Sequence, residues 1–204
     1  MPEWRLRDLV LPALAMTVVV AVSNVAVQYP VRLFGLEHYL TWGALTYPVS
    51  FFITDLTNRR YGPGLARRVV AVGFLFAVLL SLGLAVPRIA LASGSAFLAG
   101  QLLDITVFNR LRRMTWWRAP LASSLIGSAL DTAMFFTIAF AGVAAMSGPT
   151  HYTVAGLALT VPLWIGLAFF DYVVKASCAL VSMLPYGALL GVVRPVEAVA
   201  SGRS

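Results

Sequence analysis

The stretch YPVSFFITDLTNRRYG, residues 47–62, begins as an apolar helix and ends as a basic loop. Its aromatic and aliphatic residues suit a lipid-facing segment, and Arg59 and Arg60 suit the edge of a membrane. Asp55 precedes the basic part. A charge near the bilayer centre costs at least about 2.5–3.5 kcal/mol on insertion scales. This acid therefore needs polar neighbours that the protein itself supplies.

The composition of the whole chain also indicates a membrane protein. Its 204 residues are 60% hydrophobic and 11% charged, whereas an ordinary soluble domain carries about 25% charged residues. The net charge of +7 comes from short basic groups between long apolar runs, so the predicted partner is the lipid bilayer and not nucleic acid. The single cysteine, Cys178, excludes a disulfide framework and a cysteine metal cluster, and we expect no cofactor.

Six apolar runs are long enough to cross about 30 Å of hydrocarbon as helices. We predict an all-α fold in which residues 1–204 form a single transmembrane domain. Pro48 predicts a kink beside Tyr47, because proline leaves the carbonyl of Ala44 without its usual helical donor. The predicted spans are 8–28, 38–57, 65–86, 91–111, 120–142 and 164–192.

Two of these assignments have alternatives. The first run could be a signal peptide, although we find no clear cleavage site and five more runs follow. The last apolar region could contain two short spans, which would need a turn near Asp171, but residues 169–175 contain neither Gly nor Pro. We therefore predict one final span, preceded by a short reentrant or interfacial segment at 154–162.

The arginines predict the orientation, because Lys and Arg near span ends tend to stay on the cytoplasmic side. One set of alternate connections contains twelve arginines, whereas the other contains only Arg32 and Arg88. Both termini should therefore be cytoplasmic, in the cell inner membrane. The twelve are Arg5, Arg7, Arg59, Arg60, Arg67, Arg68, Arg110, Arg112, Arg113, Arg118, Arg194 and Arg203.

Four acids, Asp55, Asp104, Asp131 and Asp171, fall inside the predicted spans with one base, Lys175. They should face inward, where polar groups or water can compensate them. Asp171 and Lys175, spaced i, i+4, could simply neutralise each other. Asp55 could likewise pair with Arg59 or another loop arginine as an interfacial anchor. Asp104 and Asp131 have no ionic partner on their own helices, which favours a role in ligand binding.

Helical spacing places these acids on stripes that also carry aromatic rings. A planar polar ligand would use the rings for stacking and the amides and carboxylates for its edges. A cluster of small residues, Ser123, Ser124, Gly127 and Ser128, is more typical of close helix packing. The predicted substrate site contains Gln101, Asp104, Ser128, Asp131, Phe97, Phe108, Phe135, Tyr47 and Trp164, and the predicted gating or coupling residues are Asp55, Arg59, Asn58, Asp171, Lys175 and Asn24.

Enzyme motifs are largely missing. His38 and His151 have no HExxH-type spacing, so no metal site is predicted. The sequence contains no GxxxxGK[ST] phosphate loop. We therefore expect a protein that is not an enzyme, although an intramembrane hydrolase with paired aspartates is an alternative.

Several segments resemble those of the queuosine precursor transporter family, also called the vitamin uptake transporter family. They are YPVSFFITDLTNRRYG at 47–62, SAFLAGQLLDITVFNRLRR at 95–113, SSLIGSALDTAMFFTIAFAG at 123–142 and FFDYVVKASCALVSMLPYG at 169–187. The resemblance implies a six-helix inner-membrane importer of 7-deazaguanine bases such as preQ0 and preQ1, which are salvaged for the queuosine modification of transfer RNA.

The implied substrate suits the candidate residues. A 7-deazaguanine presents a ring N–H beside an exocyclic amino group, and one carboxylate can accept both hydrogen bonds. A second carboxylate could receive the aminomethyl cation of preQ1. The alternative is a small carrier of another vitamin or nucleobase-like substrate. The sequence leaves open the energy source, a homo-oligomer and an energising partner.

The arginine asymmetry generates a topology prediction. With Cys178 replaced by serine, a cysteine at Thr150 should react with an impermeant thiol reagent added outside intact cells. A cysteine at Arg113 should react only after the membrane is permeabilised. The opposite labelling pattern would reverse the orientation.

Overall fold

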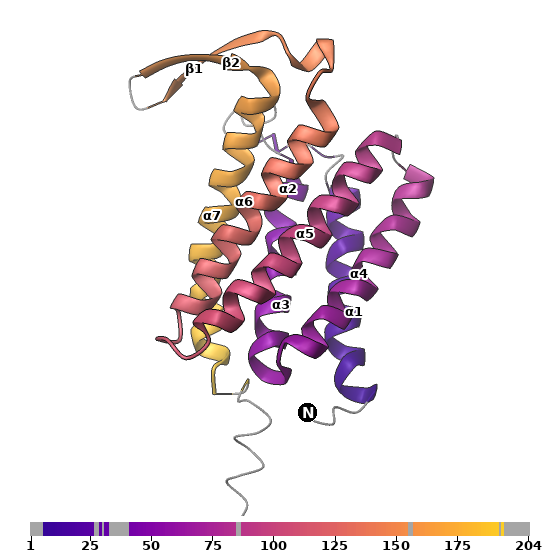
Figure 1. Ribbon diagram of the computed structural model, residues 1–204, viewed down its shortest axis with the longest axis vertical. Helices are drawn as coiled ribbons and strands as arrows, with labels where there is room; N and C mark the ends of the chain where they lie inside the picture. Colours follow the sequence, from indigo (N-terminus) through magenta and orange to yellow (C-terminus); the bar gives the residue numbers. More distant parts are fainter. Residues whose placement is uncertain are drawn as a thin grey trace, which may run out of the picture.

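The computed structural model describes residues 6–26, 29, 31–32, 41–84, 87–154, 157–191 and 193. Long helices lie side by side, a β-hairpin lies at one end of the bundle, and α1 begins at the other end (Figure 1). The helices are α1 (Leu6–Ala26), α2 (Trp42–Thr46), α3 (Pro48–Tyr61), α4 (Pro63–Leu84), α5 (Pro87–Leu111), α6 (Arg118–Phe140) and α7 (Leu163–Leu189), and a 3₁₀ turn, η2, covers Ala144–Met146.

Five helices in the described part of the chain are long and apolar enough to cross a membrane. The protein is therefore a helical, multi-pass membrane protein, as predicted. The helix of the first predicted span packs on α4, where Met16 and Val20 are buried in the core. The five helical segments are Asp8–Ala26, Pro63–Leu80, Pro87–Leu111, Arg118–Phe140 and Leu163–Leu189.

The remaining predicted span, 38–57, is not one continuous helix. Its first residues, 38–40, lie outside the described residues, and the rest forms α2 and α3, which are separated at Tyr47. The kink predicted from Pro48 is confirmed. Tyr47 N–H still donates to the carbonyl of Gly43, whereas Pro48 has no N–H to offer to Ala44. The break places the Tyr47 side chain in the middle of the bundle.

The end of α3 is fixed by its sequence and by an arginine. Gly62 has a φ of 86°, a left-handed conformation that suits glycine. Pro63 then begins α4, at the helix position where proline is best tolerated. Arg112 Nη2 donates to the carbonyls of Asn58 (2.9 Å) and Arg59 (2.6 Å). These bonds join the end of α3 to the end of α5.

The segment before the last span differs from the prediction. Where a short reentrant or interfacial segment was predicted at 154–162, β2 (Leu157–Pro162) pairs antiparallel with β1 (Pro149–Val154). Tyr, Thr and Val residues in these strands favour extended backbone. The all-α prediction therefore holds for the apolar spans but missed this hairpin. The alternative of two final spans is wrong, since α7 is continuous.

The α5 and α6 helices pack most closely, and glycines make this possible. A Cβ atom on Gly127 would lie 2.9 Å from the carbonyl oxygen of Gly100 and 3.0 Å from Cβ of Asp104. A Cβ on Gly100 would lie 2.9 Å from Cβ of Asp131. The prediction that the small-residue cluster on α6 is a packing surface is confirmed.

Polar residues gather inside the bundle, and large apolar ones face outward. Buried polar side chains include Ser50, Thr54, Asp55, Asn58, Gln101 and Asp104, each at most 2% exposed. The outer surfaces of α1 and α7 carry Leu11, Leu14, Val18, Leu180, Val181 and Leu184. This arrangement suits a bilayer, in which lipid covers the apolar exterior.

We predict that Gly127→Ala destabilises the protein, because the added methyl group would force α5 and α6 apart. Overpacking of this kind typically costs about 1–3 kcal/mol. Thermal unfolding of the purified protein in detergent measures the loss. Gly148→Ala is the control, since a Cβ there meets nothing within 4 Å. Equal melting temperatures for both variants would contradict the close packing.

Candidate functional site

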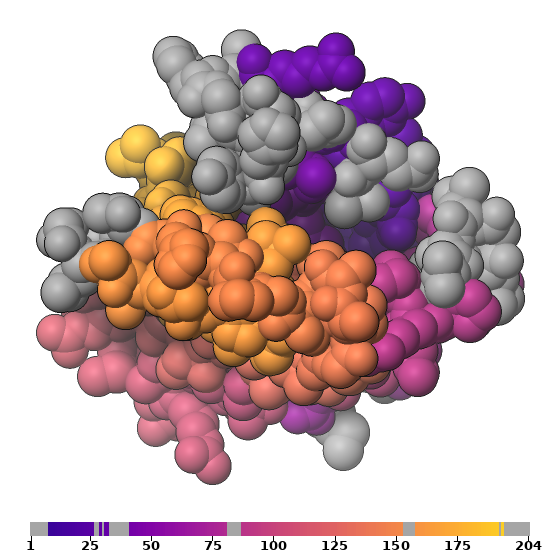
Figure 2. All heavy atoms as spheres, turned by 90° about the horizontal axis from the view of Figure 1, so that it is seen from above, coloured from indigo at the N-terminus to yellow at the C-terminus, as the bar shows by residue number. Residues whose placement is uncertain are grey.

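A cavity of about 520 Å³ lies among α1, α2, α5, α6 and α7, within the usual range of about 300–1,000 Å³ for small-molecule sites. It occupies the half of the bundle nearest the hairpin, because its lining includes residues close to the helix ends there: Thr41, Ile89, Phe140 and Leu167. Figure 2 looks down on this end, where the hairpin lies across part of the bundle.

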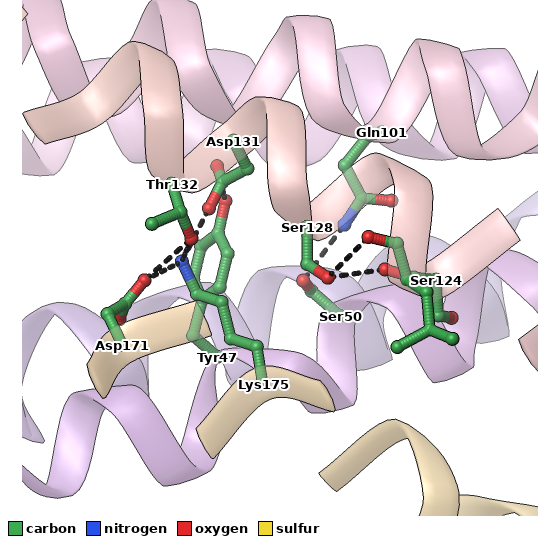
Figure 3. Close-up of polar contacts among 10 residues, drawn as sticks. Tyr47, Ser50, Gln101, Ser124, Ser128, Asp131, Thr132, Asp171 and Lys175 are labelled. Atoms are coloured by element: carbon green, nitrogen blue, oxygen red, sulfur yellow. Dashed lines mark hydrogen bonds and ion pairs between the residues drawn. The ribbon is translucent and has the colours of Figure 1, made fainter. Parts of the chain in front are cut away.

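Charged residues from two helices meet in the lining of the cavity (Figure 3). Lys175 Nζ on α7 lies 2.7 Å from Asp131 Oδ2 on α6 and 2.6 Å from Asp171 Oδ2 on its own helix. Lys175 Nζ also donates to Thr132 Oγ1 (3.1 Å), and Thr132 Oγ1 donates to Asp171 Oδ2 (2.7 Å). Two carboxylates and one ammonium give this group a formal charge of −1.

Tyr47 joins the charged group from the break between α2 and α3. Its hydroxyl donates to Asp131 Oδ1 (2.9 Å), and Lys175 Nζ lies 5.2 Å from the centre of its ring. Both oxygens of Asp131 are thus bonded. Asp171 uses only Oδ2 in hydrogen bonds with described residues, and its side chain is 17% exposed against 5% for Asp131. Asp171 lines the cavity, and none of the described residues makes a hydrogen bond to its Oδ1.

We refer to Tyr47, Asp131, Thr132, Asp171 and Lys175 as the cavity cluster. Its contacts confirm that Asp171 and Lys175 pair along α7, as the i, i+4 spacing predicted. The sequence did not show that Lys175 also binds Asp131, because that contact joins two helices. The sequence analysis also missed Thr132. Its position next to Asp131 could have identified it as a member of the site.

Aromatic rings form much of the cavity wall. Phe97 on α5 and Phe135 on α6 both line it, as do Phe136 and Phe140. Tyr47 and Phe97 pack edge to face with centroids 6.2 Å apart. Asn24 on α1 also lines the cavity, but its side-chain amide donates to the carbonyl of Val20 in its own helix. The walls therefore combine stacking surfaces with few free polar groups.

Gln101 and Ser128, two other predicted site residues, do not line the cavity. Gln101 is fully buried, with Nε2 donating to Ser50 Oγ (2.9 Å) and Oε1 accepting from Thr54 Oγ1 (2.6 Å). Ser128 Oγ donates to the carbonyl of Ser124 in its own helix. Together these residues form a polar layer between α3, α5 and α6, beyond the cavity cluster.

Asp55 and Asp104 lie on the far side of this layer. Asp55, 2% exposed, accepts hydrogen bonds from Ser123 Oγ and Ser124 Oγ, both at 3.0 Å. Asp104 is fully buried, and neither of its carboxylate oxygens has a hydrogen-bond partner among the described residues. Neither acid lines the cavity.

At the end of the bundle opposite the hairpin, Arg59 on α3 contacts α7 and the connection between α5 and α6. The alternative of an Asp55–Arg59 anchor pair is wrong for this structure. Arg59 Nε instead donates to the hydroxyl of Tyr186 (2.6 Å), and Arg59 Nη2 donates to the carbonyl of Trp116 (3.0 Å). The guanidinium carbon lies 5.8 Å from the ring centre of Phe108. Aromatic packing and two neutral acceptors hold this arginine, and Asp55 is bound by Ser123 and Ser124 instead.

Two further predicted residues lie away from the cavity. Asn58 is fully buried on α3 and donates from Nδ2 to the carbonyl of Ile105 (3.3 Å), while its Oδ1 has no hydrogen-bond partner in the described part of the chain. Trp164 lies in the first turn of α7, partly buried and outside the cavity lining. Among the residues that the structure describes, no group of three or more His, Cys, Asp or Glu side chains could hold a metal ion.

Comparison with known proteins assigns the chain to a family. The profile of the family described as "Putative vitamin uptake transporter" matches residues 41–86 and 80–190. The chain belongs to this vitamin uptake transporter family. The match begins with α2 and runs to the end of α7, so it includes every residue of the cavity cluster. The family resemblance seen in the sequence is confirmed.

Three curated proteins are similar to this chain along most of their length. The "Queuosine precursor transporter" of Escherichia coli (strain K12) is 38% identical, covering 84% of this chain and 81% of the relative. The "Probable queuosine precursor transporter" of Haemophilus influenzae is 36% identical, over 86% and 83%. The protein of the same name from Bacillus subtilis (strain 168) is 28% identical, over 80% and 76%. No solved structure matches the chain.

The cavity cluster generates a stability prediction. Lys175→Met keeps the length of the side chain but leaves Asp131 and Asp171 without a cation. Removing one partner of a buried ion pair costs about 3–5 kcal/mol, so the variant should unfold at a lower temperature. Adding Asp131→Asn should recover part of the loss, because one uncompensated charge is removed. If Lys175→Met alone were as stable as the parent protein, the charges of Asp131 and Asp171 would have to be compensated by other groups.

Proposed function

We propose that this protein imports queuosine precursors, 7-deazaguanine bases such as preQ0 and preQ1, across the cell inner membrane. The observation that carries the proposal is the cavity, which combines aromatic walls with carboxylates at a depth where charges are costly. The relatives named queuosine precursor transporters support it. Helix packing alone does not account for an acid such as Asp171 that leaves one oxygen free at a cavity.

The donors of the base match the acceptors of the cavity cluster. The ring N–H and the exocyclic amino group lie side by side, so they can both bind one carboxylate. Asp171 Oδ1 is free to make the first contact. Asp131 becomes available when the Tyr47 hydroxyl and Lys175 turn toward the base. The aminomethyl cation of preQ1 is attracted by the formal charge of −1, and Phe97 and Phe135 cover the faces of the ring.

The arginine distribution orients this cavity. With six spans and both termini in the cytoplasm, α2 and α3 together form the second span, and the hairpin lies outside. The cavity is then open to the outside, and the end closed by Arg59 faces the cytoplasm. Alternating access would bring the base past Gln101 and Ser128 as that end opens. Asp104, Asn58 and Phe108 follow along the same path, and Trp164 adds a ring near the entrance.

The proposed carrier works as a single domain. Three models for it differ in the source of energy for transport. A proton or cation gradient, facilitated diffusion with cytoplasmic trapping, and a partner ATPase predict different effects of an ionophore on uptake. Only gradient coupling makes concentrative uptake by the purified protein in vesicles depend on the gradient. The same vesicles show whether one copy suffices or a homo-oligomer is needed, when protein density is varied.

We predict that the protein restores uptake of labelled preQ0 or preQ1 in a bacterial host that lacks both queuosine synthesis and its own importer. Asp131→Asn should insert normally but lower uptake at limiting substrate by about ten- to hundredfold, since bonds to a charged group contribute about 1.5–3 kcal/mol. Asp8→Asn, on α1 and outside the cavity lining, is the matched control.

Other outcomes of this assay are equally informative. Uptake of neither base, together with competition by another vitamin or nucleobase, would assign a different substrate to the same cavity. Conversion of a lipid by the purified protein would indicate an intramembrane enzyme. Normal uptake by Asp131→Asn would remove this residue from the site.

A further inference from the structure

Asp55 and Asp104 form a buried carboxyl pair in the half of the bundle opposite the cavity. They lie on α3 and α5 and are 2% and 0% exposed. The α6 helix brings them together. Ser123 and Ser124 bind Asp55, and one turn later Gly127 lies against Asp104, where an added Cβ would be 3.0 Å from Asp104 Cβ. Both acids therefore pack against adjacent turns of α6.

The hydrogen bonds of the two acids are unequal. Asp55 receives two hydroxyl donors, which suits an ionised carboxylate. Asp104 receives none from the described residues, although it is fully buried. An ionised carboxylate without donors is among the most costly groups to bury. A protonated Asp104 avoids this cost, because its O–H can donate to Asp55.

The charged groups around the pair do not remove the need for a proton. Arg59 on α3 is turned toward Tyr186 on α7 and the carbonyl of Trp116. Arg112, directly after α5, donates to backbone carbonyls at the end of α3. Lys175 on α7 is bound to the carboxylates of the cavity cluster. Among the described residues, no cation forms a salt bridge with Asp55 or Asp104.

We propose that Asp55 and Asp104 bind one proton between them while this end of the bundle is closed, and release it when the end opens. In the closed state Asp104 carries the proton and Asp55 the single negative charge. When α3 separates from α5 and α6, water solvates both carboxylates, and the proton passes to water on that side. The proton balance is one proton bound per closure and one released per opening.

This inference rests on the alternating access of the proposed function, but it concerns the empty protein and needs no substrate. Because the closed state binds the extra proton, acid favours closure and higher pH favours opening. The end that opens is the cytoplasmic one in the proposed orientation. The pair therefore makes access to the transport path depend on the pH of that compartment.

Infrared spectroscopy of the purified, substrate-free protein tests the bound proton directly. At neutral pH the parent protein should show the C=O stretch of a protonated carboxylic acid. Asp104→Asn should lose this band, because the amide can donate to an ionised Asp55 without any proton. Asp8→Asn, the matched control, should keep it. Absence of the band in the parent protein, or its persistence in Asp104→Asn, would overturn the proposal.

Cysteine accessibility tests the link between the proton and opening. In a Cys178→Ser background, Ala119→Cys places a thiol at a fully buried position beside Phe108 and Tyr186, at the closed end. Its labelling by a permeant reagent should accelerate with pH by up to about tenfold per unit more than in the same protein with Asp104→Asn. The second protein corrects for ionisation of the thiol.

If the ratio of the labelling rates with and without Asp104→Asn does not change with pH, opening is independent of the Asp55–Asp104 pair. If Ala119→Cys fails to fold, the infrared result alone decides whether the proton is bound. Loss of base uptake with both signals intact would overturn the substrate assignment and leave the proton site standing. Uptake of the base in the absence of both signals would support the substrate assignment and overturn the proton site.

Discussion

The structure depends on how charges are compensated inside a membrane. Lys175 is the centre of this compensation, since its ammonium contacts carboxylates on two helices and lies beside the ring of Tyr47. An uncompensated charge at this depth would favour a different packing of α6 and α7. Asp171, one of these carboxylates, also lines the cavity and is 17% exposed. The arrangement that allows the helices to pack is therefore also the one that can receive a polar ligand.

The polar interior is divided into two parts with different environments. The cavity cluster borders open space, whereas Asp55 and Asp104 are enclosed. Gln101, Ser50 and Thr54 lie between them and satisfy one another's hydrogen bonds. Such a layer adds no net charge and seals one half from the other. One open half and one closed half is the asymmetry expected of a single state of an alternating-access carrier.

Much of this architecture follows from the sequence, because lipid imposes simple constraints on length, polarity and helix breakers. The apolar runs predicted six spans, of which five are long apolar helices in the described residues. Pro48 predicted the break at Tyr47, and the acids were expected to point inward. The interhelical contacts were not predictable, since the partner of Asp131 depends on the rotation of α7. The pairing of Arg59 with Tyr186 was missed for the same reason. Only the assembled bundle brings these residues together.

The hairpin shows a different limit of sequence reasoning. Its second strand, β2, is apolar enough to be mistaken for a membrane-associated segment, yet its backbone groups pair with β1 beyond the helix ends. Register and pairing depend on two segments at once, so hydropathy along one segment cannot reveal them. The aromatic residues of the candidate site divide in the same way. Phe97 and Phe135 face the cavity, whereas Phe108, equally aromatic in sequence, lies under Arg59.

The glycine contact between α5 and α6 limits which parts of the molecule can move. Helices packed this closely resist sliding and tilting against each other, so we expect α5 and α6 to move as one body. Asp104 and Asp131 both belong to this body, one on each helix. Asp55 belongs to α3, and Lys175 belongs to α7. Both acidic clusters are therefore divided by the same mechanical boundary, and a rocking of α5 and α6 against α3 and α7 would change the two clusters in a single motion.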